Sequence, residues 1–185
     1  MNEHYFLALP LTSSLKQEIH WWTAKIQRDW PFLQWVHPQD YHLTLIFLGK
    51  ATSKQLESIC QKLKEVPYDR FKIQIHEIGT FGNEEKPRIL WAGVEDNPVL
   101  CSLQAYVYTV CKQEGIPLEA RQFTPHITLA RKWGGENVFS LNEIQNDFVF
   151  TMKKSPMVVE NIVLYRTHMN QSPKYEAIQR FPLNR

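Results

Sequence analysis

The residues best suited to chemistry in this chain are two histidines, each followed two positions later by a threonine. The motif His42-Leu43-Thr44-Leu45 recurs 84 residues later as His126-Ile127-Thr128-Leu129. Successive side chains of a strand point to opposite faces, so each histidine shares a face with its threonine while the aliphatic residues take the other. One His-x-Thr-Leu is expected about 0.04 times from this composition, and a pair on the order of once in a thousand chains. The repeat therefore indicates a paired site.

Two imidazoles beside two hydroxyls suit acid–base chemistry on a phosphate ester. A neutral histidine can take a proton from water while a protonated one gives a proton to a leaving oxygen, each typically contributing about 10²–10⁴ in rate. Thr44 and Thr128 can donate hydrogen bonds to phosphoryl oxygens. Arg131, five residues after His126, lies near the strand end, where its planar guanidinium suits phosphate. The symmetric motifs do not say which histidine is the acid.

Short strands and amphipathic helices are expected to position both motifs. In the first helix, Leu15, Ile19, Trp22 and Ile26 recur at helical spacing and form one apolar stripe. The expected strands are 5–9, 42–49, 71–75, 88–94, the second motif strand from 126 and a strand within 156–165; the expected helices are about 12–27, 52–67 and 98–115. We expect loops at 29–40, 79–87 and 142–146, and a short helix or strand at 175–181.

The order strand, helix, irregular loop and motif strand occurs twice along the chain. This order predicts an α+β fold in which one domain, 1–185, consists of two pseudo-repeats of about 1–84 and 85–185. We expect two lobes related by an approximate twofold axis, with antiparallel-rich sheets flanking a central cleft and helices on the outside. Such an axis would bring both His-Thr faces to the cleft.

Composition limits the class of protein. The chain of 185 residues is 43% apolar and 22% charged, as in a soluble globular protein, and its net charge of +2 gives no strong overall attraction to nucleic acid. Any anionic ligand must therefore be held locally. Cys60, Cys101 and Cys111 lack metal-type spacing, which argues against a zinc site or disulfide framework, and we expect Cys60 and Cys101 in the core. With neither a signal peptide nor a membrane span evident, we expect a cytoplasmic protein.

Two segments resemble the paired motifs of the 2H phosphoesterase superfamily, more specifically its bacterial and archaeal RNA 2′,3′-cyclic phosphodiesterase branch. They are His42–Gly49 and Phe123–Arg131, and Pro87–Trp91 is similar to the strand between the motifs. The resemblance covers essentially the whole chain. It implies a two-lobed α+β fold and hydrolysis of an RNA terminal 2′,3′-cyclic phosphate to a 2′-phosphomonoester, without metal or other cofactor. It also implies that His42 protonates the departing 3′ oxygen and that His126 activates water.

Three alternative functions remain at this point. The chain could bind RNA ends or small cyclic nucleotides without turnover, or it could be a 2H enzyme for a different small cyclic phosphate. A metallohydrolase is disfavoured, because two histidines and two threonines make a poor zinc site and neither motif contains a carboxylate.

Several aromatic and basic residues have two readings each. Phe47 and Trp91 could stack a nucleobase or simply fill the core. Lys153 and Lys154 could contact an RNA backbone or form an ordinary charged loop. Nothing periodic suggests a coiled coil, and we expect a monomer.

Overall fold

The computed structural model describes residues 3–120, 122–152 and 156–185. Its largest element is an eight-stranded antiparallel sheet of order β10-β9-β1-β3-β7-β6-β5, with β2 also paired to β7, and β4 pairs with β8 in a separate two-stranded sheet. The strands are β1 His4–Pro10, β2 Phe32–Trp35, β3 His42–Gly49, β4 Phe71–Ile73, β5 Ile75–Gly82, β6 Pro87–Val94, β7 His126–Trp133, β8 Met157–Val159, β9 Asn161–Thr167 and β10 Tyr175–Pro182. The helices are α1 Ser13–Ile26, α2 Ser53–Lys62, α3 Pro98–Gln113 and α4 Asn142–Met152.

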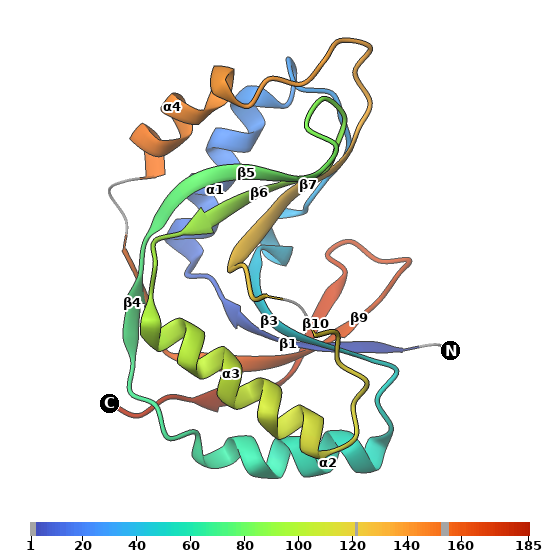
Figure 1. Ribbon diagram of the computed structural model, residues 1–185, viewed down its shortest axis with the longest axis vertical. Helices are drawn as coiled ribbons and strands as arrows, with labels where there is room; N and C mark the ends of the chain where they lie inside the picture. The colour runs from blue at the N-terminus through green and yellow to red at the C-terminus, as the bar shows by residue number, and fades with distance from the viewer. Residues whose placement is uncertain (1–2, 121, 153–155) are drawn as a thin grey trace.

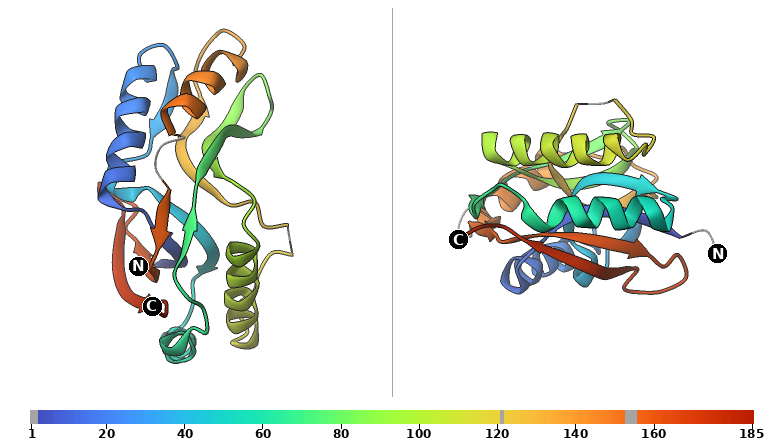
Figure 2. Two further views of the ribbon diagram at one scale, coloured as in Figure 1. Left: turned by 90° about the vertical axis from the view of Figure 1, so that its left-hand side faces the viewer. Right: turned by 90° about the horizontal axis from the view of Figure 1, so that it is seen from below.

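The molecule has two lobes that meet at the two motif strands. In Figure 1, one lobe contains β5, β6 and β7 with α1 and α4, and the other contains β1, β3, β9 and β10 with α2 and α3. The left view in Figure 2 shows the same division, with the helices on the outside. The predicted two-lobed α+β fold is confirmed. None of the helices in the described ranges is long and apolar enough to cross a membrane.

The two lobes place their strands in equivalent positions. In one lobe β1 lies beside β3, with Ala8 opposite Thr44, and in the other β6 lies beside β7, with Trp91 opposite Thr128. Next to β1 lies β9 from late in the chain, whereas next to β6 lies β5 from its first half. Each lobe therefore contains strands from both halves of the sequence.

Side-chain caps and buried stripes explain where the helices form. Thr12 accepts a hydrogen bond from the backbone N–H of Leu15 at the start of α1, and Thr52 with Gln55 forms a capping box at the start of α2. The predicted apolar stripe of α1 is buried along its whole length. The inner face of α3 likewise buries the apolar side chains that its periodicity predicts.

Three expected loops contain regular structure. Within residues 29–40, β2 pairs with β7; within 79–87, β5 continues to Gly82; and within 142–146, α4 begins. β2 is short and follows Pro31, and its pairing with β7 adds it to the sheet. Ile144 and Phe148, one helical turn apart, provide the buried stripe of α4 despite its polar start. The segment 175–182 is a strand, which decides between the two expected forms.

The cysteines only partly follow the expected burial. Cys111 is buried, Cys60 is half-buried and Cys101 is exposed, and all three are free thiols. The expectation that Cys101 lies in the core is wrong, because its neighbours Leu100 and Leu103 occupy the inward face of α3.

Gly79 on β5 makes room for the indole of Trp91 on the neighbouring strand. A Cβ atom at this position would overlap Cζ2 and Cη2 of Trp91, whose side chain is only 9% exposed. We predict that Gly79→Ala lowers the free energy of unfolding by about 1–3 kcal/mol through overpacking. Chemical denaturation of Gly79→Ala, Trp91→Leu and the double variant tests this. If the overlap is the cause, Gly79→Ala loses most of its effect in the Trp91→Leu background; an undiminished loss there would contradict the explanation.

Candidate active site

The two His-x-Thr motifs lie side by side at the centre of the sheet. Leu43 of β3 is paired with Ile127 of β7 in antiparallel register. One residue to either side, His42 is therefore level with Thr128, and Thr44 with His126. The histidines and threonines are half-buried, whereas Leu43 and Ile127 are fully buried. The structure thus brings all four polar side chains to one face.

Each imidazole is held by a hydrogen bond of the same kind, from its Nδ1 to the backbone carbonyl two residues earlier. Nδ1 of His42 lies 2.6 Å from the carbonyl oxygen of Asp40, and Nδ1 of His126 lies 2.7 Å from that of Thr124. A carbonyl oxygen only accepts, so Nδ1 carries a proton in each ring. Nε2 is therefore the atom through which each ring can exchange a proton.

Aromatic side chains surround both histidines. The ring of His42 lies 4.8 Å from that of Phe6 and 5.0 Å from that of Tyr175, to which it is perpendicular. The ring of His126 lies 4.9 Å from that of Phe81, also at nearly a right angle. Phe6, Tyr175 and Phe81 are not singled out by the sequence, because they come from strands far from the motifs along the chain. Only the strand register could reveal them.

A bulge in each motif strand turns a further residue toward the histidines. Strict alternation would place a residue five positions after a histidine on the opposite face. In β7, Thr128 pairs with Trp91 and Ala130 with Leu90, so one residue is extra, and Arg131 returns to the face of His126. A matching register shift in β3 returns Phe47 to the face of His42.

Arg131 and Phe47 thus occupy equivalent places in the two strands. The guanidinium of Arg131 is close enough to Tyr175 and to His42 for its positive charge to act on the pKa of each, opposing the rise that burial causes in Tyr175 and adding to the fall that burial causes in His42. The side chain of Phe47 is 57% exposed, whereas that of Trp91 is 9% exposed. Of the two candidate stacking residues, Phe47 therefore offers far more surface to a ligand. Lys153 and Lys154 lie outside the described residues.

The surroundings of His42 favour its neutral form. Burial is the largest cause that lowers its pKa, to about 4, and the charges of Lys16, of Arg131 and of His126 when that ring is protonated act in the same direction. The hydrogen bond to the Asp40 carbonyl opposes this shift. An anion placed among these groups would relieve their mutual repulsion, so the electrostatics suit a phosphate.

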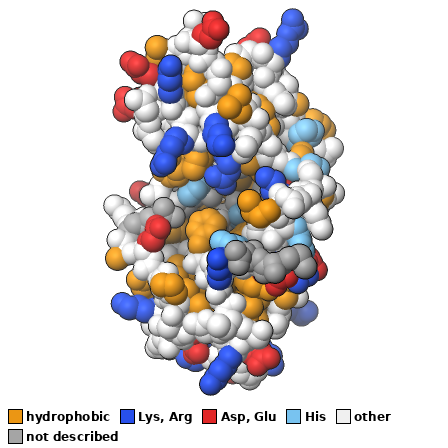
Figure 3. Space-filling view, turned by 90° about the vertical axis from the view of Figure 1, so that its right-hand side faces the viewer, with side chains coloured by type: hydrophobic (Ala, Val, Ile, Leu, Met, Phe, Trp, Pro, Cys, Tyr) orange, Lys and Arg blue, Asp and Glu red, His pale blue; other side chains and the backbone are white. Residues whose placement is uncertain are grey.

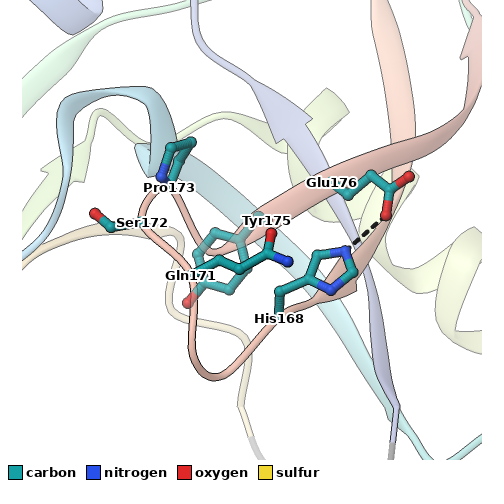
Figure 4. A pocket seen from close by; sticks show the side chains of 6 residues that line it. All are labelled: His168, Gln171, Ser172, Pro173, Tyr175 and Glu176. Atoms are coloured by element: carbon teal, nitrogen blue, oxygen red, sulfur yellow. Dashed lines mark hydrogen bonds and ion pairs between the residues drawn. The ribbon is translucent and has the colours of Figure 1, made fainter.

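The surface around these residues is hollowed. Figure 3 looks onto the waist between the lobes, where Lys, Arg and His side chains gather around a recess with hydrophobic groups. A neighbouring hollow of about 650 Å³ is lined by residues 168–176 of the β9–β10 hairpin, among them Tyr175, as Figure 4 shows. Through Tyr175 this hollow adjoins His42. In the described parts of the chain, no three His, Cys, Asp or Glu side chains cluster as metal ligands would.

The chain matches a family model and named relatives along nearly its whole length. The model described as LigT like phosphoesterase matches residues 9–91 and 94–175. An RNA 2′,3′-cyclic phosphodiesterase of Bacillus subtilis is 37% identical over 186 residues, covering 100% of this chain and 98% of the relative. A protein of the same name from Geobacillus stearothermophilus is 40% identical over 184 residues, covering 98% of this chain but 58% of the relative.

Solved structures agree with the fold. Escherichia coli LigT complexed with 3′-AMP superposes with a TM-score of 0.82, at 21% identity and 99% coverage of each chain. TT0787 of Thermus thermophilus superposes with a TM-score of 0.74, at 23% identity and 97% coverage of each chain. With its full-length relatives and paired motifs, this chain belongs to the LigT-like phosphoesterases of the 2H superfamily.

Proposed function

We propose that this chain hydrolyses the terminal 2′,3′-cyclic phosphate of RNA to a 2′-phosphomonoester, using two histidines and no metal. The observation that carries the proposal is the pair of imidazoles held alike through Nδ1 on adjacent central strands. The names of the relatives at 37% and 40% identity support the substrate class. The chain spans little more than half of the Geobacillus relative, at 58%, but nearly all of the Bacillus one.

In the proposed reaction, water attacks phosphorus and the bond from phosphorus to the 3′ oxygen breaks. Nε2 of His126 takes a proton from the water as the new P–O bond forms. Nε2 of His42 gives a proton to the departing 3′ oxygen. The ring of His42 ends neutral and that of His126 ends protonated, so proton exchange with solvent resets the site.

The remaining polar groups have roles that follow from their position. Thr44 and Thr128 donate hydrogen bonds to the non-bridging phosphoryl oxygens, and Arg131 balances their negative charge. The exposed ring of Phe47 stacks on the terminal base, and the nearly buried Trp91 supports His126 from the neighbouring strand.

The low pKa of His42 in the free protein has a consequence for this mechanism. An acid must hold a proton when the substrate is bound, yet Lys16, Arg131 and His126 disfavour the proton in the empty site. The negative charge of the cyclic phosphate would raise the pKa of His42 by offsetting them. We therefore infer that the substrate itself brings His42 into its protonated form.

The same features support proposals on the domain organisation, the oligomeric state and the cellular location of the protein. We propose one domain of two pseudo-repeats, about 1–84 and 85–185, because the histidines, bulges and backbone hydrogen bonds recur at equivalent positions. We propose a monomer, since one chain supplies both histidines. Three free thiols support action in the reducing cytoplasm.

Replacing either histidine tests the proposal directly. We expect His42→Ala and His126→Ala each to lower kcat on a cyclic-phosphate oligonucleotide by about 10²–10⁴, because each removes one proton transfer. His20→Ala, on the exposed side of α1, is the matched control and should keep full activity. End-group analysis of the RNA measures turnover, and circular dichroism confirms folding. Activity should persist in excess chelator. Binding of both cyclic and opened ends without turnover would instead favour an RNA-end binding protein.

A substrate with sulfur in place of the 3′ oxygen tests which histidine acts as the acid and which as the base. A thiolate leaves without protonation far more readily than an alkoxide, because the pKa of a thiol is much lower. With a 2′,3′-cyclic phosphate carrying 3′ sulfur, His42→Ala should recover most of its lost kcat, whereas His126→Ala should not. Recovery in His126→Ala alone would mean that the two roles are exchanged.

The pKa of His42 gives a prediction that needs no substrate. Its folded value of about 4 lies below the ordinary 6.5, so the unfolded chain binds this proton more tightly. The stabilisation from neutral His42, on the order of 3 kcal/mol, should be present above pH 6.5 and lost as the pH falls through 4. We expect His42→Asn to show a smaller fall in the free energy of unfolding over this range by chemical denaturation. Parallel pH curves for the two proteins would contradict the shift.

A further inference from the structure

Asp40, two residues before the first motif histidine, carries a buried carboxylate. The residue is only 5% exposed. Its carboxylate oxygens accept hydrogen bonds from the backbone N–H groups of Lys174, at 2.9 and 3.1 Å, and of Tyr175, at 3.2 Å. A buried carboxylate is costly unless it is well hydrogen-bonded, so these contacts fix the start of β10 against the segment before β3.

The same residue also fixes His42. The backbone carbonyl of Asp40 accepts the hydrogen bond from Nδ1 of His42 at 2.6 Å. One residue thus holds a motif histidine with its main chain and a distant segment with its side chain. At the equivalent place before His126 stands Thr124, which has no carboxylate to match.

Tyr175, whose backbone the carboxylate holds, contacts two rings of its own lobe and lies near a charged group of the other. Its ring lies 5.0 Å from that of His42 on β3, perpendicular to it, and 4.9 Å from that of Phe6. Burial raises the pKa of Tyr175, and its hydroxyl lies close enough to Arg131 on β7 for the positive charge there to oppose that rise. Figure 4 shows Tyr175 at the end of the hairpin loop, directly before β10 continues. Moving this ring would therefore disturb the imidazole and the guanidinium together.

We propose that Asp40 is a positioning residue whose carboxylate, by holding Tyr175, sets His42 and Arg131 at the spacing that the reaction requires. The proposal rests on the function proposed above. The carboxylate of Asp40 hydrogen-bonds the backbone N–H groups of Lys174 and Tyr175, so in this proposal its effect passes through Tyr175. The ring of Tyr175 supports the imidazole of His42, while its hydroxyl orients Arg131 toward a phosphate.

Kinetics of Asp40 variants on nucleoside 2′,3′-cyclic phosphate test this role. Asp40→Leu removes both acceptor oxygens and should lower kcat by about 10²-fold, the effect of a small misplacement of catalytic groups. Asp40→Asn keeps one oxygen acceptor for the same N–H groups, so we expect it to recover at least about tenfold of that loss. Tyr175→Phe keeps the ring but loses the hydroxyl, and should raise KM more than it lowers kcat.

A double-mutant cycle distinguishes positioning from a general loss of stability. If Asp40 acts through Tyr175, Asp40→Leu in a Tyr175→Leu background should lower kcat by less than about threefold further. The NMR signal of the His42 ring should also move in the same direction in both single variants, because both displace a perpendicular aromatic ring. Should Asp40→Leu not fold, the same cycle is run with Asp40→Asn and Tyr175→Phe, again with sub-multiplicative losses expected.

Thr23→Val provides the matched structural control. Thr23 is 4% exposed, and its hydroxyl is hydrogen-bonded to that of Tyr41, the residue directly before His42. Loss of the Thr23 hydroxyl should lower the free energy of unfolding. Any fall in kcat that it causes should multiply with the fall caused by Tyr175→Leu, as for two independent substitutions. Multiplicative losses for Asp40 and Tyr175, or kcat of Asp40→Leu within threefold of the unmodified protein, would overturn the inference. Absence of hydrolysis by the unmodified protein would overturn the proposed function instead.

Discussion

The pairing of Leu43 with Ile127 is the contact on which the candidate site depends. It joins the two central strands and sets each motif histidine level with the threonine of the other motif. Because side chains alternate along a strand, a slip of one residue would turn a histidine into the core and a leucine toward solvent. The fully buried side chains of both residues oppose such a slip, so burial of apolar surface fixes the geometry of the polar groups.

Around this pairing, the protein concentrates positive charge and excludes water from one side. Lys16, Arg131 and His126 all act on His42, and the rings of Phe6 and Tyr175 cover it. These basic groups are close together because the folded sheet holds them there, at a cost that burial elsewhere offsets. A site with this arrangement is prepared for a small anion before the anion arrives, which is the condition for strong electrostatic stabilisation of a phosphoryl group.

The sequence predicts the parts of the fold that depend on local pattern. The repeated motif, the apolar stripe of α1 and the α+β class could be inferred from residue type and spacing, and the two lobes from the family resemblance. The aromatic rings around the histidines could not, because Phe6, Phe81 and Tyr175 reach them only through strand register. The bulges that redirect Arg131 and Phe47 depend likewise on pairing with β6 and β1, and the place of β2 in the sheet depends on its pairing with β7. The local propensity of a segment does not indicate which strand it will pair with.

In each lobe one outer strand comes from the other half of the sequence than the strand it pairs with, with β9 beside β1 and β5 beside β6, and this arrangement affects how the chain folds. The lobe with β1 and β3 is completed by β9 and β10, the last strands of the chain, while β5 is committed to the other lobe. The lobe with β1 and β3 therefore cannot be completed before β9 and β10 have been synthesised. Because the sheet depends on many long-range contacts, we expect slow folding, in which the surroundings of His42 are complete only after β10 has paired with β9.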